Sequence, residues 1–381
     1  MLATAVFLIA FDFQNLLSLW WGKVLLPDGT ESHDFTLVVP LFGDPKYFER
    51  RGELLVFQKQ VLVAIEVSPE KMVRFADQLE DEGWRVERIV QESPNPASLM
   101  KAGLDAVTTT YVLRLDADTF VDVRLPLTVA AVAASGADIC STKVEARNPR
   151  TIPAKLQALE YRMAMLSRHF RPWMTSGACF IGKTDSMRRI YAQHSLWSPG
   201  EDIETGRIAH ALKMKIRHAD MVVQTDVPET WRALFRQRTL WWAGSFRHTI
   251  VNADRNLLQL PVQTTYLIFV VWASVYYRWW SHIDVHSLPK TLPLLFLVYI
   301  VVTFISNIQV ASPWMLVFPL YALVHTMVLP AIGALRFVIL ARKRGRLGRY
   351  EFGYRRSSTQ ANPRATPDPL VTWASGLREA A

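Results

Sequence analysis

A 45-residue stretch without a charged side chain, from Thr291 to Leu335, constrains this chain more than any other feature of its sequence. Such a stretch is too long for one core helix of a soluble domain, and a membrane crossing takes about 20 apolar residues. A second uncharged stretch runs from Leu257 to Tyr277. Together they predict membrane helices at roughly residues 260–279, 291–310 and 314–340.

The two ends of the chain extend this membrane prediction. Residues 1–24 carry only the charges of Asp12 and Lys23, and they lack the basic start and the cleavage site of a signal peptide, which predicts a retained membrane helix. The basic segment Arg342–Arg349 predicts a cytosolic C-terminus, and residues 342–381 read as this segment followed by a disordered tail. With a cytosolic domain before them, three crossings would place the tail outside. One of the stretches in 257–341 is therefore expected to be interfacial or re-entrant.

The composition of the chain limits the kinds of molecule that it is expected to bind. With 381 residues, 50% hydrophobic, the chain is not disordered, and its net charge of +9 favours a nucleic acid, a phosphorylated ligand or an anionic membrane face. The two cysteines, Cys140 and Cys179, are too few for a disulfide scaffold. Because the basic residues concentrate at the predicted membrane edge, we expect no nucleic-acid partner.

Residues 32–256 show alternating strand and helix patterns. Apolar runs predict strands, and amphipathic or capped segments between them predict helices. The expected strands are 35–40, 60–67, 84–90 and 111–115, and the expected helices include 69–82 and 97–107. This alternation predicts an α/β domain with a largely parallel, doubly wound sheet, in which ligands bind at the carboxyl ends of the strands.

Two carboxylates stand at one such strand end. Asp116 and Asp118 directly follow the apolar strand 111–115, and paired carboxylates of this kind can hold a hard divalent cation whose other ligands come from a diphosphate. A D-x-D pair also occurs in solvated turns. Its position after a buried strand favours the binding site.

Two further segments carry polar groups suited to chemistry. In Ser198–Glu204, acidic residues open a helix after a turn, a pattern that simple helix capping also explains. In Phe235–Trp242, a glutamine, two arginines and two tryptophans precede the first predicted membrane stretch after the domain. They can clamp phosphate and stack on sugar rings, although an interfacial belt has the same composition.

These segments are more specific in combination than alone, because they occur in a defined order. The order is Val39-Pro40, Lys101-Ala102-Gly103, Asp116-Ala117-Asp118, Ser176-Gly177-Ala178-Cys179, Gly200-Glu201-Asp202, Pro228-Glu229-Thr230 and Gln237-Arg238-Thr239-Leu240-Trp241, followed by the apolar stretches. Over about residues 35–345, the order resembles the processive family 2 glycosyltransferases, the hyaluronan, chitin and cellulose synthases and their relatives.

The resemblance implies a GT-A-type domain at 32–256, on the cytosolic side of a plasma membrane, attached to the helices of 257–341. It implies transfer of a sugar from a UDP-sugar to a growing polysaccharide that leaves through the membrane helices, with Mn²⁺ or Mg²⁺ assisting UDP departure. Direct attack opposite the leaving group inverts the anomeric carbon, so an α-linked donor gives a β-linked product.

The resemblance also assigns roles around the donor. Asp202 matches the catalytic base, Asp118 the metal ligand and Asp116 the nucleotide carboxylate. Lys101 matches a lysine near the diphosphate. Glu66, at the end of the second strand, matches an acidic residue on the uracil or ribose.

Further roles concern the acceptor and the diphosphate. Gln237 and Arg238 match diphosphate-binding positions of a Q-x-x-R-W signature, whereas Glu201 and Trp241 are expected at the acceptor. The family usually has arginine directly before the signature tryptophan, and this chain has Leu240 there. Because of Leu240 and the small size of the predicted membrane part, two alternatives to the processive synthase stay open. One is transfer of a single sugar to a lipid or short acceptor, and the other is an inactive assembly partner.

Overall fold

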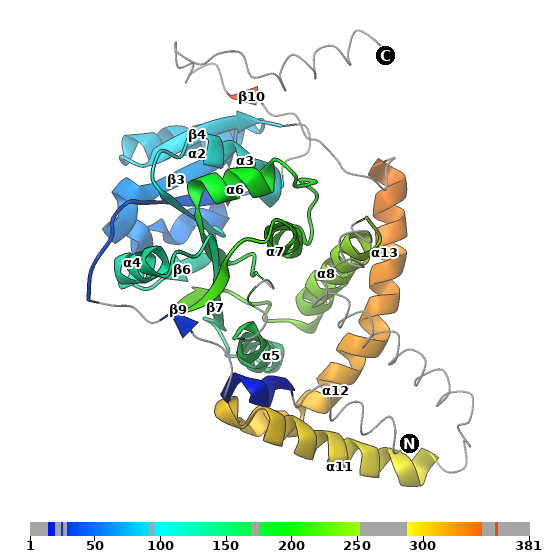
Figure 1. Ribbon diagram of the computed structural model, residues 1–381. Helices are drawn as coiled ribbons and strands as arrows, with labels where there is room; N and C mark the ends of the chain where they lie inside the picture. Colours follow the sequence, from blue (N-terminus) through cyan, green and yellow to red (C-terminus); the bar gives the residue numbers. More distant parts are fainter. Residues whose placement is uncertain are drawn as a thin grey trace. The chain divides into compact units, whose positions relative to one another are not determined.

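The computed structural model describes residues 14–19, 24–25, 29–91, 95–169, 172, 175–251, 288–344 and 355–356 (Figure 1). The chain divides into two compact units. The sheet unit comprises Val24–Val144, Trp173–Asp226 and Arg346–Ala381, and the helical unit comprises Met1–Lys23, Glu145–Pro172 and Val227–Gly345. Two parts of the predicted 32–256 domain, 145–172 and 227–256, thus fall in the helical unit.

One sheet organises the sheet unit. Its strands lie in the order β1-β9-β7-β8-β5-β2-β3-β4-β10, with β6 paired to β9. The strand bounds are β1 Val24–Leu25, β2 Phe35–Leu41, β3 Val61–Glu66, β4 Arg85–Val90, β5 Tyr111–Leu115, β6 Thr119–Val121, β7 Ile139–Ala146, β8 Cys179–Lys183, β9 Ile216–Thr225 and β10 Arg355–Arg356.

The four strands expected from the sequence are present as β2, β3, β4 and β5, and they pair in parallel. The rest of the sheet is mixed, because β8 runs antiparallel to both β5 and β7, β6 runs antiparallel to β9, and β1 runs parallel to β9. The prediction of a largely parallel sheet is therefore corrected to a mixed sheet. A continuous apolar run indicates that a strand is buried on both faces, but it does not indicate the direction of the strand.

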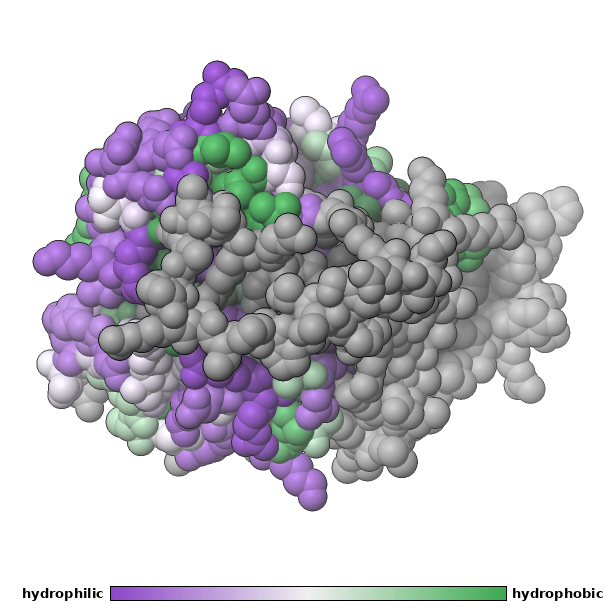
Figure 2. Space-filling view, turned by 90° about the horizontal axis from the view of Figure 1, so that it is seen from above, coloured by the Kyte–Doolittle hydropathy of each residue, from purple (hydrophilic) through white to green (hydrophobic). Residues whose placement is uncertain are grey.

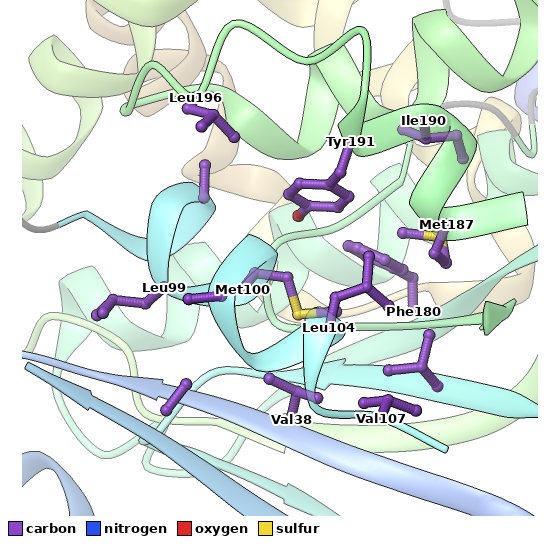
Figure 3. Close-up of a cluster of buried hydrophobic side chains, with 14 of the residues drawn as sticks. Val38, Leu99, Met100, Leu104, Val107, Phe180, Met187, Ile190, Tyr191 and Leu196 are labelled. Atoms are coloured by element: carbon purple, nitrogen blue, oxygen red, sulfur yellow. The ribbon is translucent and has the colours of Figure 1, made fainter. Parts of the chain in front are cut away.

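Helices cover this sheet and fill its core. They are η2 Pro45–Gln60, α2 Glu70–Asp81, α3 Pro96–Asp105, α4 Leu125–Ser135, α6 Thr184–Tyr191 and α7 Glu201–Ala211. Figure 3 shows the central cluster, in which Met100 and Leu104 of α3 meet Phe180 of β8 and Met187 of α6. On the face in Figure 2, hydrophilic residues predominate among those described, with smaller hydrophobic groups between them.

Helix α3 packs closely against the sheet. Asn95 caps it by accepting hydrogen bonds from the backbone of Ala97 and Ser98. A Cβ at Gly103 would lie 2.6 Å from Cγ1 of Val38, so a larger residue does not fit at this contact. The glycine of the Lys101-Ala102-Gly103 segment therefore has a packing role, because it allows α3 to approach β2.

The helical unit has its own apolar core. Its elements are η1 Gln14–Leu19, α5 Ile152–Arg168, α8 Trp231–Val251, α11 Leu288–Ser306, η4 Ile308–Val310, η5 Pro313–Leu316, α12 Phe318–Leu323, the π-helix η6 Val324–Val328 and α13 Leu329–Arg344. Leu156, Leu159 and Met163 of α5 pack with Leu234 of α8 and Met315 of η5. Figure 1 shows α13 running beside α8.

The predicted membrane stretches have different outcomes. The stretch 260–279 and most of 1–24 lie outside the described residues. The stretch 291–310 largely coincides with α11 and η4, whereas 314–340 is divided among η5, α12, η6 and α13 instead of forming one helix. Within the part of the chain that the structure describes, no helix has both the length and the apolar character needed to cross a membrane.

Candidate active site

The pair Asp116 and Asp118 lies where β5 ends. Residues Leu115 of β5 and Cys179 of β8 are partners in the antiparallel ladder, and the backbone N–H of Asp116 donates to the carbonyl of Ala178, 3.0 Å away. The N–H of Thr119 donates to the carbonyl of Asp116 at 2.9 Å and closes a turn. The paired carboxylates therefore stand on a backbone that two hydrogen bonds hold in place, as the sequence predicts.

A pocket of about 290 Å³ opens beside this turn. Three of the residues predicted to act at the site, Asp116, Asp118 and Glu201, line it. The remaining lining residues are Pro40, Leu41, Phe42, Tyr47, Pro96, Arg114 and Ala117. A concave space with an apolar wall and a few convergent charges is suited to a small polar ligand.

Asp202 lies in the first turn of α7, close to the same carboxylates. Its Oδ2 accepts a hydrogen bond from the N–H of Gly177 at 2.9 Å, and its Oδ1 accepts one from Ile203 at 2.8 Å. A Cβ at Gly177 would lie 3.6 Å from Asp202 Oδ2, 3.6 Å from Arg114 Nη2 and 3.7 Å from Asp116 Oδ2. The structure thus brings together the predicted base, the predicted nucleotide carboxylate and the Ser176–Cys179 segment.

Arg114 is a member of this cluster that sequence reasoning missed. It is 1% exposed, and its Nη2 donates to Oδ1 of Asp116 at 3.0 Å and to Oε1 of Glu201 at 2.8 Å. The sequence carried a signal, because a charged residue inside a fully buried apolar strand requires an ionic partner.

The carboxylates of the cluster differ in pKa. Burial raises the pKa of Asp202 to about 6, and the neighbouring charge of Glu201 adds to this effect. Burial likewise raises the pKa of Asp116 to about 6 although Arg114 opposes it, and it raises the pKa of Asp118. For Glu201, burial acts upward but the ion pair with Arg114 outweighs it, so that its pKa is lowered. Separated pKa values of this kind are typical of acid–base sites.

The structure places the predicted donor residues Glu66 and Lys101 in the sheet unit, but not among the residues that line the pocket. Glu66 ends β3, is 2% exposed, and its Oε1 accepts a hydrogen bond from the N–H of Ser68 at 2.8 Å. The ammonium of Lys101 lies 3.9 Å from Oδ2 of Asp105, one turn along α3. Their assigned roles stay predictions.

The predicted residues Gln237, Arg238 and Trp241 belong to α8 of the helical unit. Arg238 is fully buried, and its Nη2 donates to Oε2 of Glu160 at 2.8 Å. The guanidinium of Arg238 also lies 4.1 Å from the ring centre of Trp241, which is 42% exposed. Their roles at the diphosphate and the acceptor stay predictions.

The residues at the pocket suit a divalent cation that a bound diphosphate helps to hold. No group of three or more histidine, cysteine or acidic side chains that could hold a metal by themselves occurs among the described residues. Mg²⁺ and similar ions are, however, often bound by one or two carboxylates together with substrate phosphates. Asp118, with Asp116 beside it in a partly buried pocket, matches that pattern.

The chain matches glycosyl transferase family group 2 over residues 111–329. This range covers more than half of the chain and includes the Asp116–Asp118 pair, the start of α7 and the signature region of α8. The protein therefore belongs to this family of nucleotide-sugar-dependent glycosyltransferases. Membership of glycosyltransferase family 2, which the order of the motifs predicts, is confirmed, whereas the processive membrane subtype and its alternatives stay predictions.

One solved structure shows a similar fold, and another is less similar. Mannosyltransferase PcManGT from Pyrobaculum calidifontis, in complex with GDP-Man and Mn²⁺, is similar with a TM-score of 0.54 at 15% identity, covering 88% of this chain and 98% of that chain. TarS 1–349 from S. aureus, in complex with UDP-GlcNAc, gives a TM-score of 0.39 at 13% identity, covering 82% of this chain and 92% of that chain. No curated protein matches the sequence. The likeness to PcManGT supports a GT-A-like mixed sheet for this chain.

Proposed function

We propose that this protein transfers a sugar from a UDP-sugar to an acceptor hydroxyl with inversion at the anomeric carbon, and that the acceptor is a growing polysaccharide. One observation carries the proposal. Asp116, which lines the pocket with Asp118 at the end of β5, lies near Asp202 at the start of α7, because carboxylate oxygens of Asp116 and Asp202 both approach Gly177. A group for binding a charged nucleotide therefore lies beside a candidate base.

Asp202 serves as general base. An acceptor hydroxyl is a weak nucleophile, and a carboxylate within hydrogen-bonding reach removes its proton as the new bond to the anomeric carbon forms. The two backbone hydrogen bonds from Gly177 and Ile203 keep the carboxylate of Asp202 oriented for this task. Its pKa of about 6 keeps it ionised at neutral pH while it stays basic enough to accept the proton.

Asp116 and Asp118 help the leaving group, UDP, to depart. The bond between the anomeric carbon and the diphosphate breaks as the new bond forms, and UDP leaves with additional negative charge. Asp118, with Asp116 beside it, would hold Mn²⁺ or Mg²⁺, and the ion, when bound, would neutralise the diphosphate charge. Tyr47, which lines the same pocket, is an aromatic residue near these carboxylates.

Single-sugar transfer to a lipid or short acceptor is the second candidate. It is favoured by Leu240, which stands where processive relatives usually have an arginine, and by the ion pair that engages Arg238 with Glu160. The length of the product made by the purified chain distinguishes the two candidates, because a processive enzyme releases long chains while donor is still in excess.

We further propose that the helical unit contacts a lipid bilayer. Large apolar side chains of α11 and η4 are exposed at helical spacing, at Leu294, Leu297, Val301, Phe304, Ile305 and Ile308. A further exposed set on α13 comprises Ile332, Leu335, Val338 and Ile339. Exposed apolar stripes of this extent mark a surface that is covered by lipid or another apolar partner.

Nucleotide release by the purified full chain tests the proposed reaction. The donors are a panel of UDP-sugars and GDP-sugars, each tried with Mn²⁺ and with a chelator. We expect release from a UDP-sugar, loss of release in the chelator, and loss in Asp118→Asn, which removes one anionic ligand. Release that is undiminished in the chelator contradicts the metal assignment, and preference for a GDP-sugar contradicts the donor assignment.

A further inference from the structure

A charged side chain, that of Arg114, is buried inside the sheet. Arg114 lies in the buried strand β5, yet one of its nitrogen atoms, Nη2, contacts carboxylates from two different elements. One is Asp116, just beyond the end of β5, and the other is Glu201, the first residue of α7 and 87 positions further along the chain. Arg114 therefore links the two segments that carry the nucleotide carboxylates and the candidate base.

Hydrogen bonds hold the backbone of Glu201 as well as its side chain. Its carbonyl accepts a hydrogen bond from Nε2 of His194 at 2.9 Å and another from Oγ1 of Thr205 at 2.9 Å. The other ring nitrogen of His194, Nδ1, accepts a hydrogen bond from the N–H of Leu196, so the ring proton is on Nε2. With its side chain on Arg114 and 7% exposure, Glu201 has little freedom to move.

We propose that Arg114 is a positioning residue for glycosyl transfer: it ties the start of α7 to the end of β5 and so holds Asp202 in place beside Asp116. Glu201 then anchors α7 instead of binding the acceptor. This inference rests on the proposed function, since it takes Asp202 as the base. Asp202 directly follows Glu201, so a shift of the anchor moves the base relative to the donor pocket.

Stability alone does not account for an arginine here. Nε and Nη1 of Arg114 are buried and have no hydrogen-bond partner among the described residues, which makes the burial costly. Both contacts are made by the single nitrogen Nη2, so a lysine ammonium, which also carries several N–H donors, can reproduce part of them. The pair of contacts to Asp116 and Glu201 is therefore what the buried charge of Arg114 provides.

The test compares substitutions of Arg114 with a matched arginine elsewhere in the sheet. Arg114→Met removes the charge, and Arg114→Lys keeps it. The control is Arg88→Met, because Arg88 is also a buried strand arginine, 7% exposed, whose Nη2 pairs with Asp77 and Glu80, and it does not line the pocket. The measurements are the melting temperature, kcat and KM for nucleotide release, and the affinity for UDP with Mn²⁺.

If Arg114 is a positioning residue, its substitution should lower kcat without abolishing the binding of UDP. In the folded Arg114→Met protein, kcat falls by about 10²-fold, the loss that a small misplacement of a catalytic group causes, while UDP still binds. Arg114→Lys recovers part of kcat. Arg88→Met lowers the melting temperature but keeps the kcat of the folded protein. Wild-type kcat in Arg114→Met overturns the inference, and so does complete loss of UDP binding, which would make Arg114 a nucleotide-binding residue.

A double variant addresses the case in which Arg114→Met does not fold. Arg114→Met with Glu201→Gln removes one cation and one anion, so the net charge of the cluster is unchanged, while the link to α7 is still broken. We expect this variant to fold and to keep the low kcat, and a wild-type kcat overturns the inference. A wild-type chain that releases no nucleotide and binds neither UDP nor GDP overturns the proposed function, and the positioning role with it.

Discussion

At the scale of single residues, the site brings several negatively charged side chains close together. Asp116, Asp118 and Glu201 line one pocket, Asp202 lies near Asp116 at Gly177, and burial disfavours the ionised form of each. Arg114 compensates part of this charge, most strongly at Glu201, whose pKa is lowered. The contrast between Glu201 and Asp202 shows how two adjacent acidic residues obtain different properties from different contacts.

Asp202→Asn separates binding from chemistry. The substitution keeps the shape of the side chain and removes the base, so we expect turnover to fall by about 10²–10⁴-fold while the affinity for UDP changes little. Nucleotide release and calorimetric titration with UDP measure the two quantities. A parallel loss of UDP binding would assign Asp202 to the nucleotide or to the capping of α7.

The pKa of Asp202 predicts the acid side of the pH profile. A general base acts in its deprotonated form, so kcat rises as the pH increases through about 6 and then levels off. The rate of nucleotide release between about pH 5 and 8, at constant Mn²⁺, measures this limb of the profile. A rate that does not change over this range is incompatible with Asp202 as the base.

At the scale of elements, close contacts between backbones explain residues that motif comparison leaves without a role. Gly103 lets α3 approach β2 in the sheet unit, and Gly333 does the same for α13 and α8 in the helical unit. A Cβ at Gly333 would lie 2.4 Å from Cβ of Trp242. Trp242 is thus part of a helix contact, whereas the adjacent Trp241 is more exposed and stacks on Arg238.

Gly103→Ala tests the contact between α3 and the sheet. The added methyl group would lie 2.6 Å from Val38 and 3.1 Å from Ala64, so we expect the free energy of unfolding to fall by about 1–3 kcal/mol. Urea unfolding followed by tryptophan fluorescence measures the change. The matched control is Gly52→Ala, which meets no described atom within 4 Å and should not lower the free energy of unfolding. Equal values for the two variants would refute the packing role.

The two neighbouring tryptophans of α8 are expected to respond differently. If Trp241 stacks on the acceptor sugar, Trp241→Ala lowers transfer while slow hydrolysis of the UDP-sugar by water persists, because water needs no stacking surface. Trp242→Ala should instead lower the melting temperature, since it removes a ring whose centre lies 5.9 Å from that of His325 in η6 and 6.2 Å from that of Phe246. The measurement is the ratio of sugar transfer to hydrolysis in both variants. An unchanged ratio in Trp241→Ala argues against binding of the acceptor by Trp241.

At the scale of the whole molecule, the exposed apolar residues are distributed unevenly over the chain. Many of them belong to α11, η4 and α13 of the helical unit, and isolated examples such as Leu55 and Val56 belong to the sheet unit. Isolated exposed apolar residues are ordinary on protein surfaces, whereas rows of them on one helix face are not.

Flotation of the full chain with anionic phospholipid vesicles tests the proposed lipid contact. Leu294→Glu with Leu297→Glu places two charges on the exposed face of α11, and we expect less protein to float with the vesicles. The matched control is Leu55→Glu with Val56→Glu, at positions of similar exposure in η2, which should leave flotation unchanged. Equal flotation of both variants and the wild type would show that the α11 face does not contact lipid.

The sequence by itself determined the family, the presence of the four strands β2 to β5 and the position of Asp116 and Asp118 at a strand end. These features are local, because a buried strand has a continuous apolar pattern and the next residues must lie at its edge. The structure alone decided that the sheet is mixed, that 145–172 belongs to the helical unit, and that Arg114 pairs with Glu201. Strand direction, unit boundaries and ion pairs depend on which distant segments meet, and no local pattern records the partner of a residue 87 positions away.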